Sequence, residues 1–443
     1  MRGTSDIPLL RHEVLQEFVE KYKAPPSLIL NNMFPSRNAD SSTIKWESQR
    51  GGRGMTPFVP PGAPAPVSAG YGVAQHRAEA AYWKEKRYFD EEVLNNLRKP
   101  GTDARHWRAA EIVADNLADI MNRSARRKEW MFCQMLFNGS FTYQIKGGYQ
   151  VTVDYKVPSD HQVTLGTAYD WDDGGSKNIL SDIKNAKLKI AEACGGKVDY
   201  MFINSKGLNV LGNDTTIRQL LQKNYFGDGS YMASPGINDT ALVNADVLGS
   251  LFGIRNIVVY DEMYEAKAWL TAAVTGGSTT WLTVSDASDF EANEKIWIYD
   301  ASEADDNYET RVIYSVDKAN NRIQIEYPPT NSYKAGEDFV MMQKYFIPND
   351  KAAFMASSVE GKPVARYYNA PFGLGRHYGR YTDKKDEWDP EGTWIRVQDK
   401  GLPVMLNRDA VYTIDFTATA EQSITTTSTT TTTSSTTTTT SAG

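Results

Sequence analysis

The sequence predicts an α+β fold into which a small all-β domain is inserted. A long stretch from Asp103 to Phe137 carries apolar residues at helical spacing, and short apolar strands alternate with helices through the middle of the chain. From Trp269 to Gln343 the pattern changes, and only strand patterns and turn residues follow one another. We therefore expect an α+β body that carries a separate β-barrel or sandwich.

Length and charge limit the classes of protein to consider. The chain has 443 residues, more than one hydrophobic core usually supports, and a net charge of -7. A negative net charge argues against a protein that grips nucleic acid by neutralising its phosphates. No segment reaches the roughly 18 consecutive apolar residues that span a bilayer, and the N-terminus lacks the pattern of a signal peptide. We expect a cytoplasmic protein without a membrane partner.

The N-terminal part predicts an arm and then a long loop. Apolar residues at helical spacing run from Leu9 to Val19 and stop at Pro25-Pro26, which predicts a helix and an arm over residues 1–42. Residues 43–82 are rich in glycine and proline and cannot bury a core of their own. Such an excursion is either a surface for a partner or a stiff linker, and composition favours neither. The candidate contact residues in it are Arg50, Gly51, Gly52, Arg53, Gly54, Pro57 and Phe58.

The stretch from Asp103 to Phe137 predicts one long helix. At 1.5 Å for each residue it would be roughly 50 Å long, well beyond a typical globular helix. A polar stretch interrupts its second half, and we expect these side chains to be solvated or ion-paired rather than bound to phosphate. They are Arg123, Arg126, Arg127 and Lys128.

The middle of the chain predicts alternating strands and helices. Strands are expected at 149–153, 163–165, 200–204 and 257–260, and helices at 179–193 and 215–223. Cys133 and Cys194 have no partner at a metal-binding spacing, so we expect two buried thiols.

Common catalytic and metal motifs do not occur in the sequence. There is no phosphate-binding Gly-rich loop, nucleophile elbow or His-Glu-x-x-His helix, and the five histidines are scattered singly. The run from Asp170 to Gly175 superficially resembles a calcium loop, but Ser181 stands where such a loop needs a bidentate glutamate. We expect a solvated acidic turn there, and no cofactor or metal site.

The insertion predicts its own core and an exposed surface. Lys318 to Asn321 fits a hairpin turn between two of its strands. Three tryptophans of the insertion are candidate contact residues, namely Trp269, Trp281 and Trp297. The expected core residues are Leu282, Val284, Ile296, Ile298, Val312, Ile313, Ile323 and Ile325.

The C-terminal part predicts strands at 394–397 and 410–416, followed by a tail that cannot fold. Every residue from Thr425 to Ser441 is serine or threonine. A mucin-like linker has this composition, but a disordered or artificial extension is favoured.

Several motifs, in this order, resemble the lambda-type phage major capsid protein E family. The loop Arg50-Gly-Gly-Arg-Gly-Met-Thr-Pro-Phe and the helix opened by Asp103-Ala-Arg resemble its extended loop and spine helix. The other similar segments are Asn138-Gly-Ser-Phe-Thr, residues 252–262, residues 345–351 and residues 394–412. The inserted β segment and the Ser/Thr tail depart from the family pattern.

The resemblance implies the Hong Kong 97-like fold and a division of the chain. The implied order is the N-terminal arm (1–42), extended loop (43–82), peripheral domain with spine helix (83–180) and first part of the axial domain (181–268). Then come the inserted β domain (269–343), the second axial part (344–375), C-terminal strands (376–420) and a disordered tail (421–443). The insertion is expected at an exposed loop tip outside the shell.

The resemblance also implies the function. We expect the non-enzymatic major capsid protein of a tailed bacteriophage, which self-assembles into hexamers and pentamers of an icosahedral shell around double-stranded DNA. The DNA would be held without sequence-specific contacts, and scaffold, portal and decoration proteins are further implied partners. The protein would lie in the virion and assemble in the cytoplasm of a host bacterium. A tail-fibre or carbohydrate-binding structural protein, or a nanocompartment shell of the same fold, remains as an alternative.

Overall fold

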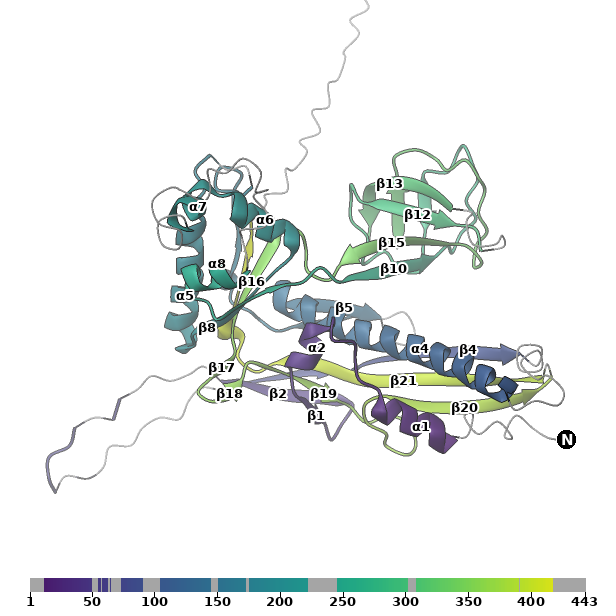
Figure 1. Cartoon of the computed structure of the whole chain (residues 1–443), viewed down its shortest axis with the longest axis horizontal. Coiled ribbons are helices and arrows are strands. Elements are labelled where there is room, and N and C mark those ends of the chain that lie inside the picture. Colours follow the sequence, from purple (N-terminus) through teal and green to yellow (C-terminus); the bar gives the residue numbers. More distant parts are fainter. Residues whose placement is uncertain are drawn as a thin grey trace, which may run out of the picture.

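The computed structural model describes residues 12–49, 55–56, 58–62, 64, 73–90, 104–144, 150–172, 175–221, 245–301, 308–389 and 391–416. Three bodies are visible in Figure 1: a long sheet with a long helix, a second sheet flanked by shorter helices, and a β-barrel. The chain therefore has the predicted α+β character, with an inserted all-β domain.

The long sheet is organised around strand β21 (Glu391–Met405). Strand β4 (Ala81–Asp90) pairs with one edge of β21, and β20 (Tyr381–Trp388) and then β19 (Ala365–Asn369) pair with the other. The short strand β1 (Ser36–Asn38) adds to β19 in parallel. Helix α4 (Ala104–Phe137) lies along this sheet, which confirms the predicted long helix (Figure 1).

Apolar side chains hold the helices to one face of the long sheet. Leu117 and Met121 of α4 pack with Ile395 and Val397 of β21 in one buried cluster. The same cluster includes residues of the N-terminal helix α1 (His12–Lys21), which contacts β20, so part of the predicted arm is packed against the sheet.

A buried ion pair also ties α4 to β21. The Lys128 ammonium group lies 2.7 Å from the Asp399 carboxylate, and their side chains are 9% and 0% exposed. Burial lowers the pKa of Lys128, and the charge of Asp399 opposes this shift. Arg123 pairs with Glu85 at 3.1 Å. The polar side chains of this stretch were expected to be solvated or ion-paired, and Arg123 and Lys128 are ion-paired.

The second sheet has the order β7-β22-β16-β8-β9 and shares a core with the first body. Its strands are β7 (Gln162–Thr164), β22 (Val411–Asp415), β16 (Lys351–Ala356), β8 (Val198–Ile203) and β9 (Asn256–Val259). The helices around it are α5 (Ile179–Cys194), α6 (Ser205–Asn213), α7 (Thr215–Leu221) and α8 (Ala245–Phe252). Gly195 ends α5 in a left-handed conformation, which glycine adopts without strain.

Three hairpins extend from these two sheets. They are β2 (Thr43–Gln49) with β3 (Val73–Glu79), β5 (Ser140–Gln144) with β6 (Gln150–Asp154), and β17 (Ser358–Val359) with β18 (Lys362–Pro363). Short helical turns stand at α2 (Ile29–Met33), η3 (Ser159–His161) and η6 (Arg408–Ala410).

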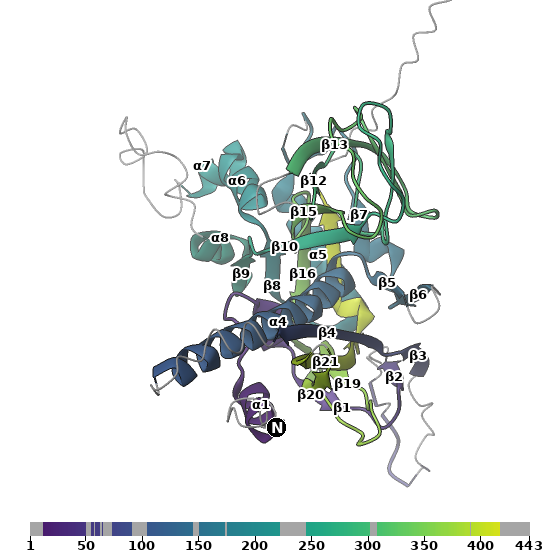
Figure 2. The ribbon, with the colours of Figure 1, turned by 90° about the vertical axis from the view of Figure 1, so that its right-hand side faces the viewer.

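The inserted strands form a six-stranded sheet in the order β10-β15-β12-β13-β14-β11. Their bounds are β10 (Met263–Trp269), β11 (Trp281–Thr283), β12 (Lys295–Tyr299), β13 (Tyr308–Asp317), β14 (Arg322–Ile325) and β15 (Phe339–Tyr345). A bridge between Leu270 and Val284 returns β11 to β10 and closes a barrel. Figure 2 shows this barrel to one side of helices α6, α7 and α8.

The barrel has a hydrophobic cluster of its own, separate from the main core. The predicted core residues lie in this cluster except Val312, for which the prediction is wrong. Val312 is half-buried because it alternates with Ile313, whose side chain points into the barrel.

Two smaller predictions have different outcomes. Both cysteines are buried free thiols, as expected. The acidic turn after Asp170 is solvated only in part: Asp172 is exposed, as predicted, whereas Asp170 is buried and accepts a hydrogen bond from the Asp172 backbone N–H at 2.9 Å. The neighbouring Trp171 is fully buried and stacks on Phe416, and this packing draws the turn into the core.

Glu129 on α4 acts as the cap of the arm helix α2. Its carboxylate accepts hydrogen bonds from the backbone N–H groups of Leu30 and Asn31, at 2.9 and 2.7 Å. Leu28, at the N-cap of α2, has no side-chain cap of its own, so a distant carboxylate satisfies these N–H groups. Burial raises the pKa of Glu129 to about 7, although the two backbone hydrogen bonds lower it.

The raised pKa predicts a pH-dependent stability. The folded subunit holds the Glu129 proton more tightly than the unfolded chain, whose glutamates titrate near 4.5. This contribution to stability is therefore present below about pH 4.5 and is lost as the pH rises through 7. We expect the free energy of unfolding of unassembled subunits in urea to fall by about 3 kcal/mol across this range, compared with Glu129→Gln.

The matched control is Glu192→Gln, at an exposed position of α5. This variant should keep the pH profile of the unmodified chain. Parallel profiles for Glu129→Gln and the unmodified chain would contradict the assignment.

Candidate interaction surfaces

The predicted loop leaves the body between β2 and β3, whose ends lie side by side because Gln49 pairs with Val73. Among the predicted loop residues only Phe58 is described, and its side chain is fully exposed. Met55 is 93% exposed beside it. Neighbouring large apolar side chains this exposed usually mark a contact with a partner. The other predicted residues lie outside the described part of the chain, namely Arg50, Gly51, Gly52, Arg53, Gly54 and Pro57.

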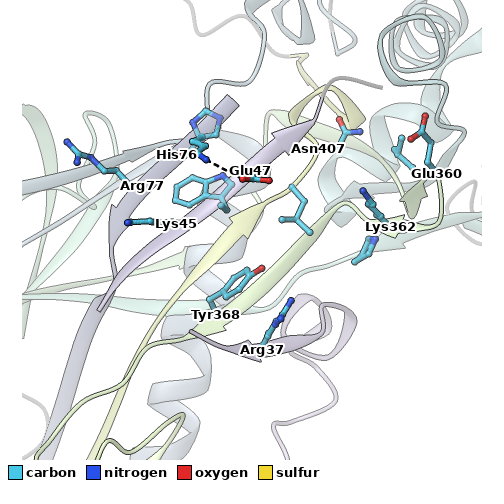
Figure 3. Close-up of a pocket in the computed structure, with 14 residues that line it drawn as sticks. Arg37, Lys45, Glu47, His76, Arg77, Glu360, Lys362, Tyr368 and Asn407 are labelled. Atoms are coloured by element: carbon cyan, nitrogen blue, oxygen red, sulfur yellow. Dashed lines mark hydrogen bonds between the residues drawn. The ribbon is translucent and has the colours of Figure 1, made fainter. Parts of the chain in front are cut away.

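A pocket of about 830 Å³ lies where this loop joins the body, and we call it the loop pocket (Figure 3). Four parts of the chain line it: the β2–β3 hairpin, the edge formed by β1 and β19, the β17–β18 turn, and Leu406 and Asn407 after β21. Its apolar lining comes from Trp46, Val359 and Leu406. Trp46 is held in place by stacking on His76, with 5.5 Å between the ring centroids.

The lining of the loop pocket carries more positive than negative groups. Its cations are Arg37, Lys45, Arg77 and Lys362, and its carboxylates are Glu47 and Glu360. His76 adds no charge near neutral pH, because burial and the nearby Arg408 lower its pKa. Its ring shares a hydrogen bond with Ser48 at 2.8 Å. The pocket therefore favours a ligand that is apolar at its centre and anionic at its edge.

The opposite end of the long sheet carries an acidic turn with an exposed tryptophan. We call residues Asp386 to Asp389, at the end of the β20–β21 hairpin, the acidic tip. Trp388 is 90% exposed there. Glu387 accepts a hydrogen bond from the Trp394 indole N–H at 2.5 Å, and Asp386 accepts one from the Thr393 hydroxyl at 2.9 Å, so the turn is braced by its own strand.

Sequence reasoning missed the acidic tip, although a signal was present. The run Asp386-Glu-Trp-Asp-Pro places a large aromatic residue among charges and next to a proline, as an exposed turn does. A tryptophan in such a turn has no core to enter and is a candidate contact residue.

The structure brings together two of the three predicted tryptophans of the insertion. Trp269 pairs with Phe339 across β10 and β15, and Trp297 pairs with Met341 of the same strand β15. Both project from the outer face of the barrel, where the Lys267 ammonium lies 4.3 Å from the Trp269 ring. Trp281 is on β11, where the Arg322 guanidinium lies 5.1 Å from its ring.

A cleft of about 620 Å³ separates the base of the barrel from helix α4. Arg126 and Arg127 of α4 line one side, and Tyr264 and Lys267 of β10 line the other. The Arg127 guanidinium lies 5.2 Å from the ring of Trp130 and makes a cation–π interaction with it.

Neither metal-binding clusters nor membrane-spanning helices occur in the described ranges. No group of three or more His, Cys, Asp or Glu side chains there could hold a metal ion. No helix in those ranges is both long and apolar enough to cross a membrane.

One protein-family model matches the sequence. The model of phage major capsid protein E matches residues 13–311, more than half of the chain. No curated protein sequence matches the chain at a significant level.

Solved structures resemble the chain over most of its length at low sequence identity. A phage-related protein from Bordetella bronchiseptica RB50 is 11% identical with a TM-score of 0.47, covering 91% of this chain and 96% of that one. A putative prophage capsid protein from E. coli CFT073 is 12% identical with a TM-score of 0.48, covering 94% and 99%. The capsid of cyanophage P-SCSP1u is 10% identical with a TM-score of 0.41, covering 87% of each chain.

Proposed function

The chain belongs to the phage major capsid protein E family, and on that premise we propose that it forms the hexamers and pentamers of an icosahedral shell around the DNA of a tailed phage. As a phage major capsid protein it is a component of the virion, and its copies associate into a capsid shell. We further propose that it acts without catalysis and that assembly takes place in the host cytoplasm. The domain division expected from the sequence is part of the same proposal.

The observation that carries the proposal is the loop between β2 and β3. Its described residues Met55 and Phe58 expose nearly all of their surface. Burial of exposed apolar side chains against a second copy lowers the free energy, because it removes apolar surface from water. We propose that Arg50 to Phe58, the predicted contact residues, lie on a neighbouring subunit in the shell.

Shortening the loop tests this proposal. Deletion of Gly51 to Pro66 should leave a folded subunit, because none of the described residues in this range lies in a buried cluster. We expect this variant to stay in small oligomers, whereas the unmodified chain gives capsomers and closed shells. Size-exclusion chromatography with light scattering and negative-stain microscopy measure the difference.

A pair of single substitutions provides the matched control. Phe58→Ser should lower the yield of shells, and Leu374→Ser, at an equally exposed leucine, should not. Normal shells from the deletion variant, or a strictly monomeric unmodified chain under all conditions of salt and concentration, would contradict the proposal.

We propose that the barrel lies on the outside of the shell and contacts neighbouring barrels through Trp269, Trp281 and Trp297. Trp269 and Trp281 are 44% and 38% exposed, and Trp297 is half-buried. Aromatic side chains of this kind are enriched where proteins meet. The barrel's separate core supports its role as an independent unit on the shell.

Replacing residues 269–343 by a short Gly-Ser linker tests the role of the barrel. Shells should still assemble, because Met263 pairs with Tyr345 and Tyr264 with Lys344, so the two chain ends that the linker joins already lie side by side. We expect these shells to disassemble at a lower temperature, since contacts between barrels are lost. Scanning calorimetry of purified shells measures this. Unchanged heat resistance would make the barrel a passive insertion, and an unfolded subunit would show that the barrel is not autonomous.

We propose that packaged DNA touches the shell without tight or sequence-specific binding, and that scaffold, portal and decoration proteins are further partners. The net charge of -7 supports weak contact with DNA, because phosphate neutralisation needs a basic face.

Isolated subunits should bind duplex DNA only weakly, with a dissociation constant above about 1 µM at physiological salt. Fluorescence anisotropy with two unrelated duplexes measures both affinity and sequence preference. Submicromolar binding, or a clear preference for one duplex, would overturn this description of the inner surface.

A further inference from the structure

We propose that the acidic tip of one subunit inserts Trp388 into the loop pocket of a second copy, so that neighbouring subunits join head to tail. The proposal rests on the proposed self-assembly and adds which two surfaces meet. The loop pocket takes part of its lining from β2 and β3 at the base of the extended loop, and neither surface belongs to the barrel.

The two surfaces lie at opposite ends of one rigid element. The acidic tip is at the start of β21, and Leu406 and Asn407 of the loop pocket directly follow its end (Figure 1). At roughly 3.3 Å for each residue, the 15 residues of β21 separate them by about 50 Å. A subunit cannot place its own tip in its own pocket, so the occupant has to be another copy.

The chemistry of the two surfaces is complementary. Trp388 offers an exposed indole, and the loop pocket offers apolar groups from Trp46, Val359 and Leu406 at its base. Buried aromatic anchors of this kind dominate the binding energy of many interfaces.

Charge favours the same arrangement. Lys384 and Lys385 lie 3.5 Å from Asp386 and Glu387, so these four charges largely offset one another, while Asp389 adds an exposed carboxylate at the turn. The lining of the pocket has four cations and two carboxylates. An anionic group beside the indole would therefore meet an excess of positive charge.

The position of the extended loop is consistent with this contact. Strands β2 and β3, between which the loop leaves the body, stand at the pocket end of the sheet, away from the acidic tip (Figure 1). A neighbour whose tip enters the pocket therefore lies beside the base of the loop. One neighbour can then receive both contacts, and a contact between unlike ends repeats around a ring until the ring closes.

Cysteine cross-linking of assembled particles tests the contact directly. Both native cysteines are buried, so an engineered pair supplies the reactive thiols. Shells of the double variant Trp388→Cys, Lys362→Cys are treated with a short bis-maleimide and run on a denaturing gel. A head-to-tail contact gives a ladder of covalent oligomers that extends beyond the dimer. The matched control is Leu374→Cys, Lys362→Cys, which carries an equally exposed thiol outside the tip and should stay monomeric.

Other gel patterns overturn the proposal. Covalent dimers from Trp388→Cys alone would mean that two tips meet each other. Assembled shells that give only monomers after treatment would mean that the tip and the pocket are apart. Failure of the unmodified chain to form any particle would instead contradict the proposed self-assembly.

A charge exchange keeps the test valid if the cysteine variants do not assemble. Asp389→Lys should lower the yield of shells about tenfold, and adding Lys362→Glu to it should recover most of that loss. Recovery supports the contact, because each single change places like charges together and the pair restores opposite ones. Shell yields that are no higher in the double variant than in Asp389→Lys would contradict it.

Discussion

The packing of helix α4 on strand β21 is the constraint on which the rest of the structure depends. Lys128 of α4 and Asp399 of β21 form a buried ion pair across this contact. Apolar residues of α1, α4 and β21 form one buried cluster in the same contact. Removal of either charge would leave the other buried without a partner, which typically costs about 3–5 kcal/mol. The pair therefore fixes the register between helix and sheet more than it adds net stability.

This helix and sheet make a long, stiff element whose ends have different chemistry. Glu129 of α4 binds the N-terminus of the arm helix α2 through two hydrogen bonds, so this part of the arm is attached to the element. The loop pocket closes one end and the acidic tip forms the other. Because the element does not bend back on itself, its ends stay available for other subunits. Assembly is then a consequence of shape as much as of any single contact.

The sequence predicted what local patterns encode and missed what the fold brings together. The periodicity from Asp103 to Phe137 predicted α4, and alternation predicted the strands and most core residues of the barrel. The loop pocket combines residues from Arg37 to Asn407, which no local pattern relates. Asp170 was misjudged for the same reason, since its burial depends on Trp171 stacking against Phe416 at the other end of the described chain. The predicted contact residues on the loop and barrel stay predictions.

A subunit with complementary ends avoids a difficulty that every shell protein faces. It has to stay soluble while dilute and still associate strongly when concentrated. An exposed tryptophan on a short turn is too small a patch to drive nonspecific aggregation, and an excess of negative charge keeps single chains apart. In the proposed contact, the tryptophan has to come from another copy, because the tip and the pocket of one subunit lie about 50 Å apart. Association then depends on protein concentration and on ionic strength. The two surfaces do not associate within a single chain and form the proposed interface between neighbouring subunits.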